Sequence, residues 1–300
     1  MRVNPNLVPD VLAALEQSQS ALTAALQQVS TGKRVNVPSD DPAASAAMVK
    51  NTIETGDTDQ YTQNVSSVLS MVQTADSALS NVVSSLTQAI SLGTQGANGS
   101  TSSSNQQSIA AQVQGILESV VAQANTSYAG YYLFAGTAST TKPFIADASS
   151  ASGYTYNGNT DVNFAAIGDD MNVQVNLPGS QVFSNSSTDV LGSLSNLVSA
   201  LQSGNASAIQ TATSSVSAAL NYIGQQRVFY GNVESRLNSQ QTYLQQETVS
   251  LSSQQTILVG IDMAEAATEL AQAQTANSAA LAAAAKVLPT TLLNYLSPPQ

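Results

Sequence analysis

Two apolar patterns, one near each end of the chain, constrain the fold more than any other feature. Near the N-terminus, positions recur at spacings of four and three, with one polar interruption: Val8, Leu12, Leu15, Gln19, Leu22, Leu26 and Val29. Near the C-terminus, Leu237, Leu244, Leu251 and Leu258 repeat every seven residues. A weaker, alanine-rich pattern follows: Ala266, Leu270, Ala273, Asn277, Ala280, Ala284 and Val287. Such spacing is typical of helices that pair as coiled coils.

The length of the second pattern indicates a rod. If residues 233–288 form one helix, that helix is about 84 Å long at 1.5 Å per residue. A helix of that length must pair along its length with another helix, and the N-terminal pattern is the obvious mate. We therefore expect a coiled coil formed by both ends of the chain, with the polar Gln19 fixing its register. The plainer alternative is the core of an ordinary helical bundle.

The segment of residues 31–42 has the residues that end one helix and begin another. Gly32 suits the left-handed position that follows a helix C-terminus. Pro42 suits the first turn of a helix, because its missing N–H has no partner to lose there. Asp41 or Ser39 can cap the free amides of that turn. The sequence therefore predicts a helix–loop–helix junction, with the second helix running from residue 43 to about residue 92.

Two adjacent cations, Lys33 and Arg34, lie in this junction, although the whole chain has only 8 basic residues. One role for them is pairing with the negative C-terminal end of a helix. The other is contact with acidic groups of a neighbouring subunit, and the sequence leaves both open. We interpret Asp40 and Asp41 as helix caps, since a catalytic carboxylate pair needs a fixed separation across a cleft.

The middle of the chain changes composition twice. Helical spacing covers residues 108–126 and returns at residues 188–223, and a Gly/Ser/Thr/Asn-rich loop is expected at 93–105. Between the helices, residues 141–185 combine turn-forming Gly and Pro with short alternating runs, which is typical of β-hairpins. We interpret the aromatic run from Tyr131 to Phe134 as core between helices and hairpins; the alternative is a ligand platform.

These patterns predict a mainly α fold with three regions. Residues 1–42 and 250–300 form a coiled-coil region from the two termini. Residues 43–140 and 186–249 form a helical-bundle rod, and residues 141–185 form a small inserted all-β domain of hairpins. The chain thus runs out through helices, crosses a β tip and returns through helices.

Composition excludes many classes of function. The chain has no Cys and no His, which rules out disulfides, thiolate nucleophiles, Cys/His metal sites and Ser-His-Asp machinery. Its net charge of −11 argues against nucleic acid as a partner. The most apolar stretch is about half the ~20 residues of a membrane span, and the N-terminus lacks the shape of a cleavable signal peptide. We expect a protein that is not an enzyme and holds no cofactor or metal.

Four stretches carry a resemblance to a known family. They read LQQVSTGKRVNVPSDDPAA at 26–44, GYYLFAGT at 130–137 followed by PF at 143–144, YNG at 156–158, and IDMAEAATEL at 261–270 with LLNYL at 292–296. Through them the chain resembles the flagellin superfamily, and within it the hook–filament junction proteins most of all. It departs from the usual pattern in its low charge, in having Val259 and Gly260 where the family usually has an acidic residue, and in lacking the family's usual basic residue near 105–107.

The resemblance implies a structural subunit of the bacterial flagellum, extracellular and exported by the type III apparatus without a cleavable signal peptide. The implied partners are flagellin, a FlgK-type hook-associated protein, a FlgN-type export chaperone and further copies of the chain in a ring, with no nucleic acid and no membrane. A filament-forming flagellin is the alternative within this class. A carbohydrate-acting enzyme or an adhesin that uses the hairpins is the alternative outside it.

Two groups of residues make up the candidate site. Subunit packing in the terminal coiled coil is assigned to Leu12, Leu15, Leu22, Leu26, Val29, Leu251, Leu258, Leu270 and Leu292. The junction motif comprises Gly32, Lys33, Arg34, Pro38, Ser39, Asp40, Asp41 and Pro42.

Overall fold

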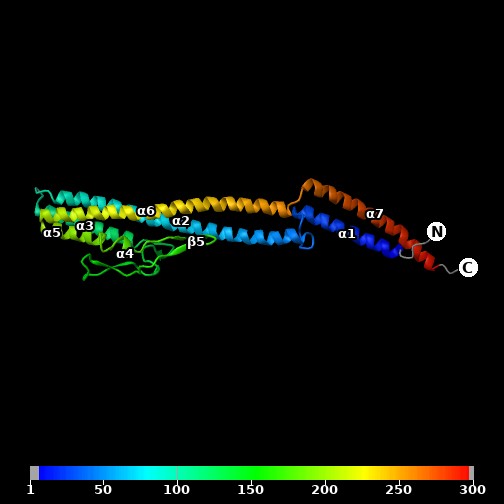
Figure 1. Ribbon diagram of the computed structural model, residues 1–300, viewed down its shortest axis with the longest axis horizontal. Helices are drawn as coiled ribbons and strands as arrows, with labels where there is room; N and C mark the ends of the chain where they lie inside the picture. The colour runs from blue at the N-terminus through cyan, green and yellow to red at the C-terminus, as the bar shows by residue number, and fades with distance from the viewer. Residues whose placement is uncertain (1–6, 100, 297–300) are drawn as a thin grey trace. The chain divides into compact units, whose positions relative to one another are not determined.

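Long helices dominate the computed structural model, which describes residues 7–99 and 101–296, with side chains described from residue 9 to residue 286 (Figure 1). The helices of this part of the chain are α1 (Leu7–Thr31), α2 (Pro42–Gly96), α3 (Ser103–Ala124), α4 (Gly179–Val182), α5 (Val190–Ser203), α6 (Ala206–Val259) and α7 (Met263–Leu296). The mainly α fold with an inserted hairpin region, as predicted from sequence, is confirmed.

The strands form three two-stranded antiparallel hairpins. Strand β1 (Ser127–Tyr128) pairs with β2 (Tyr131–Tyr132), and β3 (Phe144–Ala146) pairs with β4 (Tyr154–Tyr156). Strand β5 (Phe164–Gly168) pairs with β6 (Met171–Gln174), with a register shift between Ala166 and Gly168. The hairpins predicted within residues 141–185 are thus present. The short helix α4 in the same segment was not predicted from the sequence.

The expectation of one helix from 233 to 288 is wrong. Helix α6 begins earlier, at Ala206, and ends at Val259, and α7 begins at Met263. The side chain of Asp262 accepts a hydrogen bond from the Ala264 N–H at 2.8 Å and caps the new helix. The loop expected at 93–105 is also shorter, because α2 continues to Gly96 and α3 starts at Ser103.

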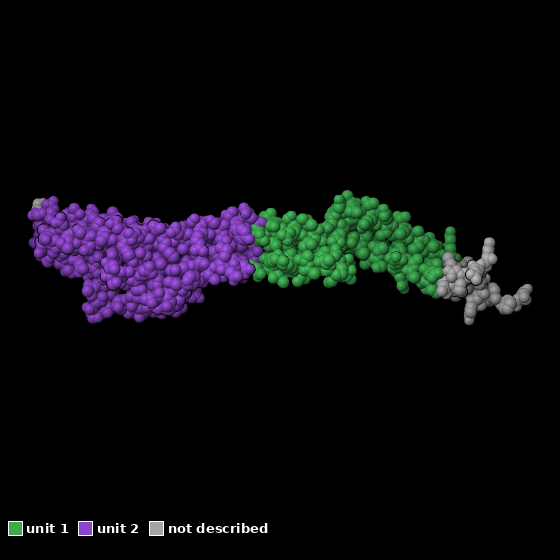
Figure 2. Space-filling view, viewed as in Figure 1, with its two compact units in different colours: residues 1–57, 247–300 green, residues 58–246 purple. Residues whose placement is uncertain are grey.

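The chain forms two compact units (Figure 2). One contains residues 1–57 and 247–300, and the other contains residues 58–246. The structure therefore divides the chain at 57/58 and 246/247, where the sequence suggested 42/43 and 249/250. It also keeps the hairpin region in the same unit as the rod helices.

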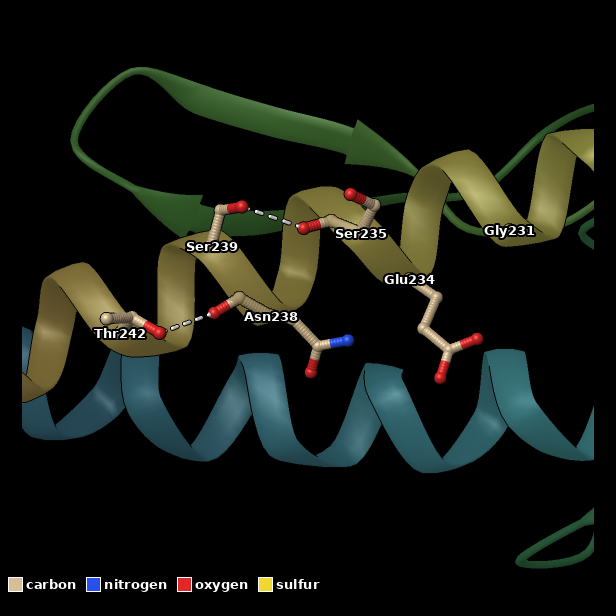
Figure 3. Close-up of a pocket in the computed structure, with 6 residues that line it drawn as sticks. All are labelled: Gly231, Glu234, Ser235, Asn238, Ser239 and Thr242. Atoms are coloured by element: carbon tan, nitrogen blue, oxygen red, sulfur yellow. Dashed lines mark hydrogen bonds between the residues drawn. The ribbon is translucent and has the colours of Figure 1, made fainter.

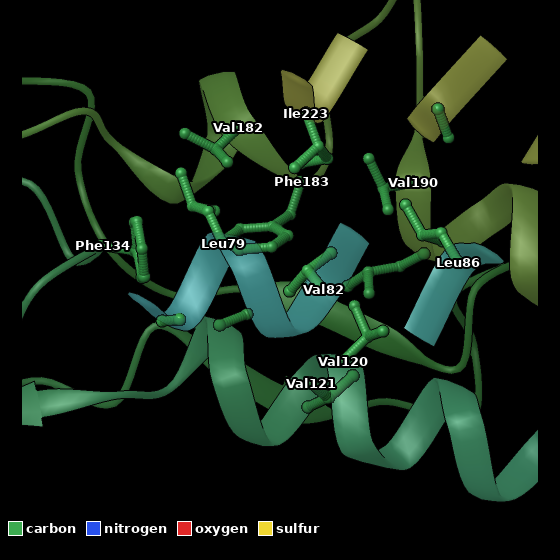
Figure 4. Close-up of a cluster of buried hydrophobic side chains, with 14 of the residues drawn as sticks. Leu79, Val82, Leu86, Val120, Val121, Phe134, Val182, Phe183, Val190 and Ile223 are labelled. Carbon is green, nitrogen blue, oxygen red and sulfur yellow. The ribbon is translucent and has the colours of Figure 1, made fainter. Parts of the chain in front are cut away.

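One hydrophobic core explains why the hairpins stay with the helices of residues 58–246. Leu79, Val82 and Leu86 of α2 are fully buried and gather with side chains from α3, α5 and α6 (Figure 4). The Phe134 and Phe183 rings meet edge to face in this core, with centroids 5.2 Å apart. The hairpin residues Phe144, Ile167 and Val173 belong to the same cluster. In the aromatic run, Leu133 and Phe134 are core residues, as interpreted, whereas Tyr131 is 56% exposed.

Side-chain amides fasten the β5–β6 hairpin to the long helices. The Asn64 side chain of α2 donates to the Ala166 carbonyl at 3.0 Å, and the Gln240 side chain of α6 donates to the Ile167 carbonyl at 2.9 Å. The two helices are themselves linked by Arg227, whose Nε and Nη2 donate to the two carboxylate oxygens of Asp76 at 2.9 and 2.8 Å. The bidentate geometry makes this a directional contact between the two helices.

Candidate functional site

A backbone pairing closes the segment between α1 and α2 onto the end of α6. Gly32 adopts φ +66°, the left-handed conformation predicted for it, and its N–H donates to the Gln28 carbonyl at 2.9 Å. The Arg34 N–H donates to the Val259 carbonyl at 2.7 Å, and Lys33 pairs with Gly260 in an antiparallel bridge. We call residues 31–44 together with 258–262 the terminal junction.

Arg34 connects three parts of the terminal junction. Its Nη2 donates to Oδ2 of Asp41 at 3.0 Å and to the Leu258 carbonyl at 3.1 Å, in the last turn of α6. A cation is favourable at that negative helix end. The first of the two roles left open by the sequence, pairing with a helix end of its own chain, is thus present for Arg34, and contact between Arg34 and a neighbouring subunit stays a prediction.

The two aspartates of the junction hold backbone amides. Oδ1 of Asp41 accepts from the Ala44 N–H at 3.0 Å and caps α2. This bond, followed by the bond from Arg34, lowers the pKa of Asp41. Oδ2 of Asp40 accepts from the N–H groups of Val37 and Asn36 at 3.0 and 2.9 Å, and these bonds lower the pKa of Asp40.

The rest of the motif lies on the surface. Pro38 and Ser39 occupy a turn that closes when the Asp40 N–H donates to the Val37 carbonyl at 3.0 Å. Lys33 is exposed, and within the described residues its ammonium group has no ion pair. Contact between Lys33 and a neighbouring subunit therefore stays a prediction.

Helices α1 and α7 pack against each other (Figure 1), and each has one face of buried and half-buried residues, which we call its packed face. Its members are buried or half-buried and follow the spacing of four and three. Along α1 they are Val11, Leu15, Ser18, Leu22, Ala25 and Val29, and along α7 they are Ala266, Leu270, Ala273, Asn277, Ala280 and Ala284. The face predicted on α7 is the one that packs as far as Ala284, and the side chain of Val287 lies outside the described residues.

On α1 the predicted face and the packed face overlap only in part. Leu15, Leu22 and Val29 are on the packed face, but Leu12 and Leu26 are 44% and 48% exposed. Gln19 is exposed as well, so it does not interrupt the packed face. We call Leu12, Gln19 and Leu26 the outer flank. The sequence missed Val11, Ser18 and Ala25, which have the same heptad spacing but weaker apolar character.

The remaining predicted packing residues lie in three different settings. Leu251 is buried, and its carbonyl accepts from the buried side chain of Asn51 at 3.1 Å, which joins α6 to α2 within the chain. Leu258 and Leu270 are half-buried. The side chain of Leu292 lies outside the described residues.

A surface pocket of about 480 Å³ on α6 offers no assembled chemistry (Figure 3). Its lining residues all come from this one helix, and the hydroxyls of Ser239 and Thr242 donate to the Ser235 and Asn238 carbonyls at 2.9 and 3.0 Å. Oε1 of Glu234 accepts from the Gln73 side chain. Over the described ranges, no cluster of acidic side chains could hold a metal ion. No helix within those ranges has the length and apolarity to span a membrane.

Comparison with known proteins places both ends of the chain in one family. The N-terminal helical region of bacterial flagellin matches residues 8–139, and its C-terminal helical region matches residues 213–296. Flagellar hook-associated protein 3 of Escherichia coli is 31% identical over 119 residues, which are 39% of this chain and 38% of that protein. A flagellin of Listeria monocytogenes is 32% identical over 87 residues, which are 29% of this chain and 30% of that one. The chain thus spans less than half the length of these relatives.

The fold has been seen in solved structures. The flagellar junction protein FlgL from Legionella pneumophila superposes with a TM-score of 0.60 at 17% identity, covering 71% of this chain and 100% of that one. At this identity the likeness concerns the fold alone.

Proposed function

Because the chain belongs to the bacterial flagellin family, we propose that it is a structural subunit of the flagellum at the junction between hook and filament. The observation that carries this proposal is the outer flank of α1. Leu12 and Leu26 remain about half exposed beside a face that is already packed on α7. A helix with apolar side chains on two adjacent faces can pack on two partners at once, so the outer flank suits a neighbouring subunit.

The proposed mechanism is mechanical. Copies of the chain form a ring in which terminal helices of neighbours pack along their outer flanks, and torque passes through packed helices instead of flexible linkers. The terminal junction supports this role because it joins α1, α2 and α6 through backbone bonds and through Arg34. A load on the terminal helices then reaches the long helices directly.

The choice of junction over filament rests on the relatives. The match to a hook-associated protein is longer than the match to a flagellin, at 119 against 87 residues. The proposed neighbours are accordingly flagellin on one side and a FlgK-type hook-associated protein on the other, and a FlgN-type chaperone accompanies the chain before export. Its place of action is the extracellular part of the flagellum.

Negative-stain imaging of the purified chain tests the proposal. Concentrated protein is imaged alone, with flagellin seeds, and with hooks that carry the partner hook-associated protein. Addition only to such hook ends, followed by flagellin growth on the added layer, supports a junction subunit. Long filaments formed by the chain alone would make it a filament flagellin and would overturn the proposal.

A further inference from the structure

Two polar groups interrupt the otherwise apolar packed faces of α1 and α7. Ser18 and Asn277 are half-buried residues, and both have an atom that is fully shielded from solvent. Within the described residues, Oγ of Ser18 and Oδ1 of Asn277 have no hydrogen-bond partner. Buried polar atoms without partners cost stability, so their place on the faces that join the two helices needs a physical reason.

The antiparallel arrangement brings the two groups to one level. The helices meet at the terminal junction, where Lys33 pairs with Gly260, and they run side by side from there (Figure 1). Counted outward from the junction, Ser18 is the fourth packed-face residue of α1, and Asn277 is the fourth of α7. By this count the two polar residues lie at the same level of the helix pair, with apolar residues on both sides.

This placement distinguishes the observed pairing from its competitors. If α1 slips by one heptad along α7, Ser18 faces Leu270 or Ala284, and Asn277 faces Val11 or Ala25. Each polar group then lies against methyl groups alone. In the observed register the count places Ser18 and Asn277 at one level, where a hydroxyl and an amide have complementary hydrogen-bonding groups. A single polar position on a coiled-coil face is known to select register and partner at a cost in stability.

We propose that Ser18 and Asn277 form a polar pair that selects α7 of the same chain, antiparallel and in this register, as the partner of α1. The pair excludes slipped pairings and pairings between the α1 helices of two copies. This matters for a chain with an outer flank, since the flank and the packed face are both apolar and compete for the same partners. The inference holds whether the assembled product is a ring or a filament.

Cysteine cross-linking in the full chain tests this, because the chain has no cysteine of its own. A Leu22→Cys, Ala273→Cys pair reports the observed register, since both are third from the junction. A Leu22→Cys, Ala280→Cys pair reports a slip of one heptad. In the native background we expect only the first pair to oxidise within one chain. With Ser18→Ala and Asn277→Leu added, we expect the slipped disulfide to rise at least about tenfold and disulfide-linked dimers to appear.

Gln19→Leu is the matched control, because it removes a polar group one residue away on the outer flank and should leave the in-register disulfide dominant. A slipped pair that stays unreactive in the Ser18→Ala, Asn277→Leu background, with helical circular dichroism intact, overturns the proposal. If the Ser18→Ala, Asn277→Leu background loses its helical signal, the proposal is tested instead with single substitutions at the two positions. Non-additive shifts of the unfolding midpoint for Ser18→Ala and Asn277→Ala support the pair, and additive shifts overturn it.

Discussion

Removing the two leucines of the outer flank should separate assembly from folding. Leu12 and Leu26 are 44% and 48% exposed in the single chain, so a Leu12→Ala, Leu26→Ala variant removes little packing from it. We expect the midpoint of chemical unfolding to change little. We expect assembly onto hook ends to weaken strongly, because both side chains become buried only when a neighbouring copy covers the outer flank.

The size of the loss follows from the exposed fraction. Full burial of a leucine side chain contributes about 1.5–3 kcal/mol, and roughly half of that remains to be gained at each of these two positions. Together they contribute about 1.5–3 kcal/mol per subunit contact, which corresponds to an association constant that is roughly 10 to 150 times lower in the variant.

The assay measures the protein concentration needed for half-maximal addition to hooks that carry the partner hook-associated protein. In parallel, urea unfolding of each variant is followed by circular dichroism. Leu22→Ala is the matched control, because Leu22 is on the packed face of the same helix. It should lower the stability of the terminal helix pair in the single chain by about 1–2 kcal/mol. If the outer-flank variant assembles at the native concentration, or unfolds as early as the Leu22 variant, the assignment of the outer flank to subunit contact is refuted.

Four further perturbations address the junction and the core. Lys33→Glu should leave the unfolding midpoint unchanged and impair addition to hooks. Arg34→Gln should lower the protection of the terminal junction in hydrogen exchange, because the bonds to Asp41 and to the Leu258 carbonyl are lost. Bonds to the ionised carboxylate lower the pKa of Asp41, so its stabilising effect is complete above the unfolded pKa of about 3.9 and disappears as pH falls through the lower folded pKa. The protection of the Ala44 amide, taken relative to the intrinsic exchange rate at each pH, should therefore fall only below about pH 4. Leu79→Ala, at a fully buried position, should destabilise the unit of residues 58–246 by about 2.7–5 kcal/mol in chemical unfolding.

Local signals predicted the helix ends well. Gly32, Asp41 and Pro42 act through bonds within a few residues, and the structure has α1 end at Thr31 and α2 begin at Pro42. The break after α6 was missed because the apolar pattern continues across it, although Gly260 and the helix-capping Asp262 are local signals of the same kind. Helix α6 ends where a segment distant in sequence pairs with its backbone. The Arg34 N–H donates to the Val259 carbonyl, and Lys33 forms an antiparallel bridge with Gly260.

The choice of packed face on α1 also lay beyond the sequence. Leucine is more hydrophobic than alanine, so the sequence favours Leu12 and Leu26 as packed positions. In the structure, however, Ala25 is buried and its neighbour Leu26 is exposed. The facing helix is rich in alanine, and small side chains let two helix backbones approach closely. The partner's surface therefore decides which of two adjacent apolar faces packs, and a pattern on one helix does not contain that information.

The chain has few charged residues, and neutral hydrogen bonds hold several distant segments together. The structure has three ion pairs among its described residues, two of them between residues close in sequence. Asn51, Asn64 and Gln240 instead fasten distant segments through neutral amide donors to backbone carbonyls. Such bonds do not titrate and are little screened by salt, so these three attachments do not depend on charged side chains. Lys33, exposed and without an ion pair among the described residues, is in this setting the cation of the terminal junction that is predicted to meet an acidic group of a neighbouring subunit.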